Sequence, residues 1–126
     1  IKGRALPLAV SGAFHSPMMA EANKELAKAL EKCGFSNPRF PVYCNVTGRA
    51  ETSAEGVKAL LLRQMTSSVM WIATVTNMYQ DGVRRFVECG PKNVLGKMLV
   101  PILDPLAQEG SYSSVSATTA EDHQAF

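Results

Sequence analysis

The sequence predicts an α/β fold with a mainly parallel sheet, and three observations lead to this prediction. Segments with helical spacing of apolar residues alternate with short β-rich runs along the chain. Glycines and prolines stand at the boundaries between these segments. The chain has 126 residues, 46% hydrophobic and 19% charged, which suits one domain around one core. Strands that alternate with helices usually pair in parallel, so we expect helices to flank the sheet.

The first predicted strand and the first predicted helix meet at His15. The run 4–14, RALPLAVSGAF, is mostly apolar and predicts a short strand that ends in a turn. Ser16 and Pro17 then supply the N-cap hydroxyl and the proline that begin a helix. The apolar face of this helix carries three residues at helical spacing, Leu26, Leu30 and Cys33. Gly34 is expected to end the helix as a left-handed C-cap.

The middle of the chain predicts one strand and two helices. The β-rich run 40–48 is expected to form a strand that closes at Gly48. Residues 52–55, TSAE, have the spacing of a capping box, so a helix should begin there. Residues 66–68, TSS, break this helix and cap the next, which Gly82 should end. The apolar face of that second helix carries Trp71, Val75, Met78 and Tyr79.

The last part of the chain predicts two strands around a short helix. The run 83–90, VRRFVECG, is β-rich and ends in a turn at Gly90. A helix over 93–100 follows, and Pro101 should end it because proline lacks the backbone N–H. A last strand is expected over 112–116. In parallel sheets ligands gather at the carboxyl ends of strands, where several of the polar residues discussed below would lie.

Charge and hydropathy exclude several kinds of partner. The net charge at pH 7 is +2, and the densest basic element is the pair Arg84–Arg85, so we expect no nucleic-acid partner. The longest apolar run is far shorter than a bilayer span, and no secretory signal is visible, so we expect a cytoplasmic location without a membrane partner. The chain begins with Ile1 directly in a predicted strand, and we therefore expect it to be a piece of a longer polypeptide.

The three cysteines indicate neither a metal site nor a disulfide framework. Cys33, Cys44 and Cys89 are odd in number, and no CxxC or CxxH spacing occurs. We expect reduced, buried thiols and no bound metal. Cys89 also has no basic neighbour in sequence that could activate it as a nucleophile.

His15 is the candidate catalytic residue. Between a strand and a helix, one ring nitrogen can meet a backbone carbonyl while the other stays free as a base. The alternative is a structural histidine that packs or caps the helix, and position alone favours that alternative. The only other histidine, His123, lies in a polar tail. No G-x-S-x-G elbow occurs in the chain, so a base is present without an obvious nucleophile.

The sequence pattern alone gives two further polar residues, Gln64 and Asn45, no clear functional role. Gln64 closes a predicted helix as a polar C-terminal residue. Asn45 follows a β-rich run and could be a ligand at a strand end or a turn former, and its pattern favours the turn former.

Four segments together resemble the malonyl-CoA:acyl carrier protein transacylase family. They are RALPLAVSGAFHSPMM, PVYCNVTG, LLRQMTSSVMW and FVECGPKNVLGKML, and they occur in the order and spacing of that family. The resemblance spans nearly the whole chain. It implies that residues 1–126 are the C-terminal part of an α/β-hydrolase-like large domain, the part that carries the catalytic histidine.

The resemblance implies acyl transfer in fatty acid biosynthesis. Family members move malonyl from coenzyme A to the phosphopantetheine thiol of acyl carrier protein by a ping-pong mechanism, through a serine in a GHSxG elbow. His15 would be the catalytic base, and the backbone carbonyl of Gln64 would orient its imidazole. Phe14 would line the acyl pocket and select against a methyl branch, and Asn45 would lie near the cleft. The coenzyme A thioester is a substrate, and no cofactor or metal is implied.

Several parts of the family pattern are absent from this chain. The serine elbow, the arginine that pairs with the malonyl carboxylate, the glutamine-bearing oxyanion loop and the ferredoxin-like subdomain would belong to a missing N-terminal segment of the same enzyme. We expect the chain alone to be inactive and poorly stable. The candidate contacts to an acidic acyl carrier protein, for which a solvated surface role is the favoured alternative, are Arg63, Arg84, Arg85, Lys92 and Lys97.

Two other functions stay open at this point. One is the acyltransferase domain of a polyketide synthase, a close relative of the transacylases. The other is a non-catalytic α/β interaction module that stands alone at this length.

Overall fold

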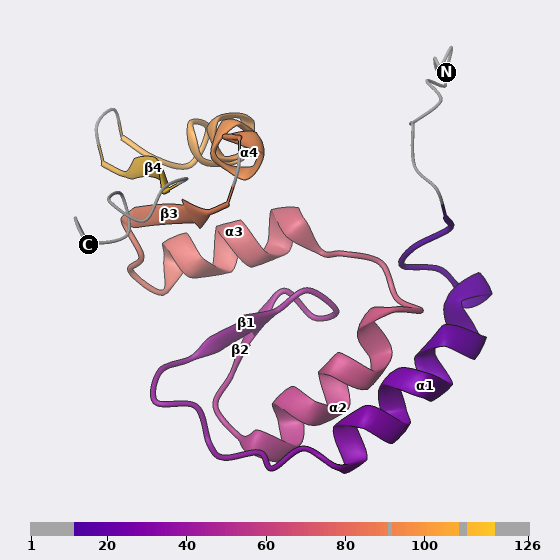
Figure 1. Ribbon diagram of the computed structural model, residues 1–126. Coiled ribbons are helices and arrows are strands. Elements are labelled where there is room, and N and C mark those ends of the chain that lie inside the picture. Colours follow the sequence, from indigo (N-terminus) through magenta and orange to yellow (C-terminus); the bar gives the residue numbers. More distant parts are fainter. Residues whose placement is uncertain (1–11, 91, 109–110, 118–126) are drawn as a thin grey trace.

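The computed structural model describes residues 12–90, 92–108 and 111–117 (Figure 1). The described part is a mixed α/β structure, as the sequence predicts. Its elements in chain order are a short 3₁₀ turn Pro17–Met19, α1 Ala20–Glu31, β1 Val42–Cys44, β2 Arg49–Glu51, α2 Ala54–Gln64, α3 Trp71–Gln80, β3 Arg85–Cys89, α4 Val94–Leu103 and β4 Ser113–Ala117.

The strands form two small sheets of different kinds. β1 and β2 are antiparallel, with Tyr43 opposite Ala50. β3 and β4 are parallel, with Val87 opposite Val115, and α4 makes the crossover between them. α1 lies alongside α2, and α3 lies between the β1–β2 hairpin and the β3–α4–β4 unit (Figure 1). The parallel pair with its crossover helix is the arrangement that alternating strands and helices predict.

The buried core lies where α3 packs against α4 and the parallel pair. Its buried side chains are Val75, Leu99 and Leu103, and burying each contributes about 1.5–3 kcal/mol. The half-buried residues that pack around them are Trp71, Tyr79, Phe86, Ile102 and Tyr112. The rings of Phe86 and Tyr112 meet edge to face at a centroid distance of 6.4 Å. α3 therefore buries the face that its helical spacing predicts.

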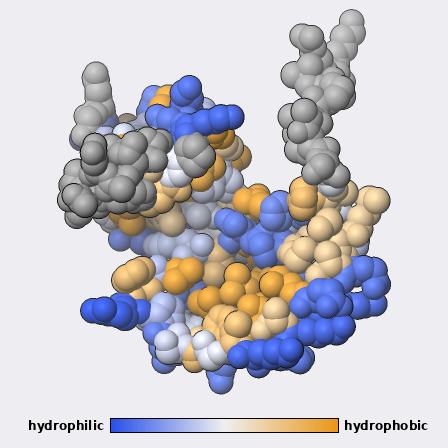
Figure 2. Space-filling view, in the orientation of Figure 1, coloured by the Kyte–Doolittle hydropathy of each residue, from blue (hydrophilic) through white to orange (hydrophobic). Residues whose placement is uncertain are grey.

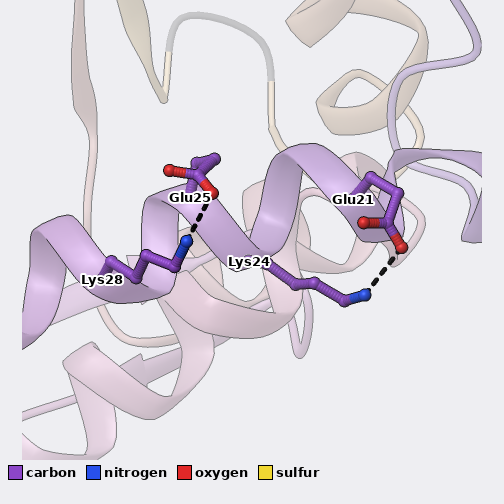
Figure 3. Close-up of polar contacts among 4 residues, drawn as sticks. All are labelled: Glu21, Lys24, Glu25 and Lys28. Atoms are coloured by element: carbon purple, nitrogen blue, oxygen red, sulfur yellow. Dashed lines mark hydrogen bonds and ion pairs between the residues drawn. The ribbon is translucent and has the colours of Figure 1, made fainter.

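The start of α1 follows the sequence prediction, and its end does not. The Ser16 hydroxyl accepts a hydrogen bond from the Met18 N–H at the start of the 3₁₀ turn. The helix ends at Glu31, and Lys32 still has right-handed helical geometry, so the prediction of a left-handed cap at Gly34 is wrong. Two exposed ion pairs run along this helix, Glu21–Lys24 and Glu25–Lys28, each at 2.7 Å (Figure 3). Such exposed pairs contribute little to stability.

Gly48 turns the chain between two strands instead of closing a single one. Its φ of 66° lies in the left-handed region, which glycine adopts without strain. A Cβ at this position would lie 2.8 Å from the Cβ of Ala73, so α3 approaches this turn closely. The β2 strand that follows was not predicted, because its three residues, RAE, lack a β-branched or aromatic side chain.

The cap of α2 is displaced by one residue from the predicted capping box. Ser53, not Thr52, is the N-cap, and its hydroxyl accepts from the Gly56 N–H at 3.0 Å. The acidic partner is Glu51 rather than Glu55. Its carboxylate accepts from the Ser53 N–H and hydroxyl and from the Thr52 N–H, and these hydrogen bonds lower the pKa of Glu51.

The third helix begins later than predicted and ends where predicted. Residues 66–68 lie between the helices, but the N-cap of α3 is Met70, so the serines do not cap it. Gly82, with a φ of 97°, follows the helix and ends it.

The last helix continues through Pro101, where the prediction ended it. Pro101 cannot donate to the preceding turn, but the N–H of Asp104 bonds to the Val100 carbonyl at 3.0 Å beyond it. Leu99 and Leu103 on either side are buried, and this burial keeps both turns helical. At the other end of the helix, the Glu88 carboxylate on β3 accepts from the N–H groups of Val94 and Gly96. The hydrogen bond from Gly96 is the main reason that the pKa of Glu88 is lowered.

Two predictions for the ends of the chain have different outcomes. Most of the predicted strand 4–14 lies outside the described residues, and residues 12–14 form a loop. The predicted strand 112–116 is confirmed as β4, shifted by one residue.

Candidate active site

The structure brings His15 and Gln64 into contact, although they are 49 residues apart in sequence. The Nδ1 atom of His15 lies 3.0 Å from the backbone oxygen of Gln64. Gln64 is the last residue of α2, and the final carbonyls of a helix have no partner within the helix. The loop before the 3₁₀ turn passes beside this end of α2 (Figure 1). The end of one helix thus presents an acceptor to the imidazole that precedes another.

This contact fits one tautomer of the imidazole. A carbonyl oxygen can only accept, so a bond at 3.0 Å requires a hydrogen on Nδ1. The side-chain nitrogen of Gln64 lies 3.2 Å from the same atom and can only donate, which would require the other tautomer. A 180° turn of the Gln64 amide would present its oxygen to the same atom, so both contacts fit an imidazole with its hydrogen on Nδ1. In the neutral ring Nε2 then has a free lone pair, which is the arrangement of a general base.

The backbone of His15 is in an uncommon conformation. Its φ is 60°, in the left-handed region, where residues other than glycine are rare. The residue itself is exposed to solvent. A side chain at such a position takes its direction from contacts that hold the turn, and backbone strain of this kind occurs often at functional sites.

A pocket of about 160 Å³ lies between β1 and α2 and includes two of the predicted site residues. It is lined by Val42, Tyr43, Cys44, Asn45, Val57, Leu60, Leu61 and Gln64. Figure 2 shows the hydrophobic surface on this side of the molecule, between the hairpin and α2. The lining is therefore mainly apolar, and Asn45 and Gln64 are the two amide residues in it.

Asn45 lies at the end of β1 and connects this strand to the start of α3. Its backbone oxygen accepts from the Met70 N–H at 2.8 Å. Asn45 therefore has a structural role through its backbone. Asn45 also lines the same pocket as Gln64, and Gln64 contacts His15.

Phe14 precedes His15 but does not line this pocket. It is 59% exposed. The structure therefore places three of the four predicted site residues around one end of α2, and it leaves Phe14 on the surface beside them.

The cysteines differ from the expectation of buried thiols. All three are free, but only Cys44 is half-buried, and Cys33 and Cys89 are exposed. Cys33 lies beyond the end of α1, and Cys89 lies on the same exposed side of β3 as Val87. Burial, with a smaller contribution from Glu51, raises the pKa of the Cys44 thiol and so disfavours its reactive thiolate.

Sequence reasoning treated Ser16 only as a helix cap and did not connect it with the site. The Ser16 hydroxyl also donates to the Ala13 carbonyl at 2.7 Å, on the other side of His15. The signal that could have found it is its position directly after the candidate histidine.

The described residues contain no group of three or more histidine, cysteine or acidic side chains that could hold a metal ion. Among the described helices, none combines the length and the apolar character needed to cross a membrane.

Comparison with known proteins identifies similar sequences. No family model matches the chain. It is 41% identical over 103 residues to malonyl CoA-acyl carrier protein transacylase of Haemophilus influenzae, an alignment that covers 82% of the chain and 33% of the relative. It is 40% identical over 92 residues to the protein of the same name from Synechocystis, covering 73% of the chain and 31% of the relative.

Solved structures of malonyl transferases are also similar to the chain. The crystal structure of an acyl carrier protein S-malonyltransferase from Vibrio cholerae superposes with a TM-score of 0.82 at 35% identity, over 97% of the chain and 38% of that structure. A malonyl-transacylase in complex with a type II polyketide synthase acyl carrier protein superposes with a TM-score of 0.81 at 36% identity, over 97% of the chain and 38% of that structure. The chain thus spans about a third of the length of the transacylases that it matches.

Proposed function

Because the chain is homologous to the C-terminal part of the malonyl-CoA:acyl carrier protein transacylases, we propose that it forms the histidine-bearing part of such an acyltransferase. The reaction would move malonyl from coenzyme A to the phosphopantetheine thiol of acyl carrier protein. The observation that supports the role of this chain is the 3.0 Å contact between His15 Nδ1 and the Gln64 carbonyl. It joins the candidate base to the one group that the family resemblance predicts for orienting it.

His15 would act as base and acid in turn. In the first half-reaction, Nε2 would take the proton of a serine hydroxyl while the serine oxygen attacks the malonyl thioester carbon. When the carbon–sulfur bond breaks, Nε2 would return the proton to the departing coenzyme A sulfur. In the second half-reaction, Nε2 would take the thiol proton of the phosphopantetheine arm, whose sulfur attacks the acyl ester, and return it to the serine oxygen.

The Gln64 carbonyl would hold the Nδ1 hydrogen through both half-reactions. A carbonyl oxygen is a neutral acceptor, so it fixes the direction of the imidazole without adding a negative charge beside it. The described residues contain no G-x-S-x-G elbow, and the serine would come from another segment of the complete enzyme. The 126-residue chain alone should therefore transfer no malonyl.

The test is malonyl transfer by the complete polypeptide that carries these residues. His15→Ala should lower the rate of transfer from malonyl-CoA to acyl carrier protein by about 100- to 10,000-fold, the usual contribution of a general base. His123→Ala is the matched control, because it also removes an imidazole. Transfer at the unaltered rate in His15→Ala would exclude His15 from the mechanism.

A second candidate function is malonyl loading in polyketide biosynthesis. It is favoured by the structural similarity to a transacylase in complex with a polyketide acyl carrier protein. Comparing transfer to a fatty acid carrier protein and to a polyketide carrier protein distinguishes the two. The same experiment tests the non-catalytic alternative, which predicts transfer to neither.

A further inference from the structure

The Ser16 hydroxyl connects the chain on the two sides of His15. It donates to the Ala13 carbonyl at 2.7 Å and accepts from the Met18 N–H at 3.3 Å. One bond reaches back to the loop before the histidine, and the other reaches forward to the start of the helix. A serine that only capped the helix would need the second bond alone.

This pair of bonds encloses the left-handed residue of the segment. His15 has a φ of 60°, which a residue with a Cβ adopts only when its surroundings hold it. Ser16 itself is extended, with φ −137° and ψ 165°. The proline at position 17 favours that extended conformation, because its ring clashes with a helical residue before it. Extended geometry at Ser16 therefore keeps its hydroxyl within reach of both partners.

The direction of the imidazole depends on this turn. From the left-handed position the ring reaches the last carbonyl of α2 at 3.0 Å, in a part of the molecule where His15 is exposed. An exposed ring has few packing contacts to direct it, so the backbone conformation and the contacts with Gln64 must do so. If the backbone relaxed out of the left-handed region, the Cα–Cβ bond would point elsewhere and the contact with Gln64 would be lost.

We propose that Ser16 is a positioning residue for His15, whose hydroxyl holds the left-handed turn that directs the imidazole to the Gln64 carbonyl. The consequence for catalysis rests on the proposed function, but the positioning itself can be measured without any turnover. Removing the hydroxyl should release the turn and leave both His15 and the Gln64 carbonyl chemically intact.

The first readout is the hydrogen position on His15, measured by NMR with ¹⁵N-labelled histidine in the complete polypeptide. His15→Gln identifies the His15 signals, and His123 serves as an internal reference. Wild-type His15 should show a hydrogen on Nδ1 in its neutral form. In Ser16→Ala the population should shift towards the Nε2–H tautomer, and Ser16→Thr, which keeps the hydroxyl, should restore the wild-type signature.

Ser53→Ala is the matched control, because Ser53 is also an N-cap whose hydroxyl accepts from a backbone N–H. It removes a cap of the same kind from α2, so a general loss of helix stability would affect both variants alike. The His15 signals should change in Ser16→Ala and stay unchanged in Ser53→Ala. If Ser16→Ala does not fold, Ser16→Gly removes the same hydroxyl with a residue that is well tolerated at an N-cap.

The second readout is steady-state kinetics of malonyl transfer. Ser16→Ala should lower kcat about 100-fold with KM nearly unchanged, the loss expected when a catalytic group is displaced by about 1 Å. Wild-type tautomer signals in Ser16→Ala would overturn the proposal, even if His15→Ala abolished transfer. Shifted signals in Ser16→Ala with full activity in His15→Ala would support the positioning and exclude the proposed function instead.

Discussion

At the scale of single residues, His15 combines solvent exposure with a left-handed backbone and one short contact to a helix end. The local part of this arrangement could be predicted, because Ser16 and Pro17 are a recognisable helix start. The contact with Gln64 could not be predicted from periodicity, since nothing in a helical pattern shows which distant residue will meet its last carbonyl. Family resemblance alone suggested that pair.

Phe14→Ser tests whether the residue before His15 selects the acyl group. If Phe14 lines the acyl pocket of the complete enzyme, the smaller side chain should make room for a methyl branch. The preference for malonyl over methylmalonyl should then fall by a factor within the range of about 10- to 200-fold that one methyl group supplies. The ratio of kcat/KM for the two thioesters measures it, and an unchanged ratio would remove Phe14 from the pocket.

Gly48→Ala should destabilise the protein by about 1–3 kcal/mol, because a Cβ is unfavourable at a φ of 66°. It would also lie 2.8 Å from the Ala73 Cβ on α3. Gly82→Ala is the control: its φ of 97° is also positive, but a Cβ there would meet nothing within 4 Å. Urea unfolding should show the larger loss for Gly48→Ala. Equal losses would mean that the contact with α3 contributes nothing.

At the scale of elements, helices and strands with long sequence patterns could be predicted better than those with short ones. The helices around Leu26 and Val75 could be predicted because several apolar residues repeat with one period. The strand predicted over 83–90 is observed as β3, and it could be predicted because the run is β-rich. The three-residue strand β2 has too few residues to show a period. The continuation of α4 through Pro101 depends on the burial of Leu99 and Leu103, and burial against another element is not visible in a local sequence rule.

Glu88→Gln should change how stability depends on pH, because the Glu88 carboxylate ties β3 to the N-terminus of α4. The folded state lowers the pKa of Glu88 from its ordinary value of 4.5, mainly through the Gly96 N–H. The stabilisation is therefore fully present above that value and is lost as pH falls through the folded pKa. At pH 7 the variant should be less stable than the wild type, and the difference should shrink below about pH 4.

Urea midpoints measured between neutral and acid pH check this prediction. Glu25→Gln is the control, since it removes a carboxylate that contacts Lys28 on the exposed side of α1. A gap between wild type and Glu88→Gln that stays constant down to acid pH would contradict the prediction.

At the scale of the whole molecule, the described part buries few apolar side chains. The buried hydrophobic residues among those described are Val75, Leu99, Leu103 and Ala117. Large apolar side chains such as Ile72, which is 68% exposed, and Met18, which is 83% exposed, lie on its surface. A core of so few buried side chains supplies little hydrophobic stabilisation.

The 126-residue chain alone should therefore unfold with a free energy below about 5 kcal/mol, the lower end of the range for independent domains. Urea unfolding followed by circular dichroism measures it, with the complete polypeptide as the reference. A cooperative transition of the isolated chain within the ordinary range would show that this core is sufficient.

The parallel pairing of β3 with β4 has a consequence for the order in which the chain folds. Cys44 and Arg49 are opposite each other across a tight turn, so the β1–β2 hairpin can form in about 1–10 μs. Arg85 pairs with Ser113, and α4 lies between them in sequence. Pairing residues so far apart in the chain is slower than forming a hairpin. Among the described strands, β3 therefore gains its partner β4 later than β1 gains β2. Disrupting the β3–β4 pair should therefore slow folding more than disrupting the hairpin.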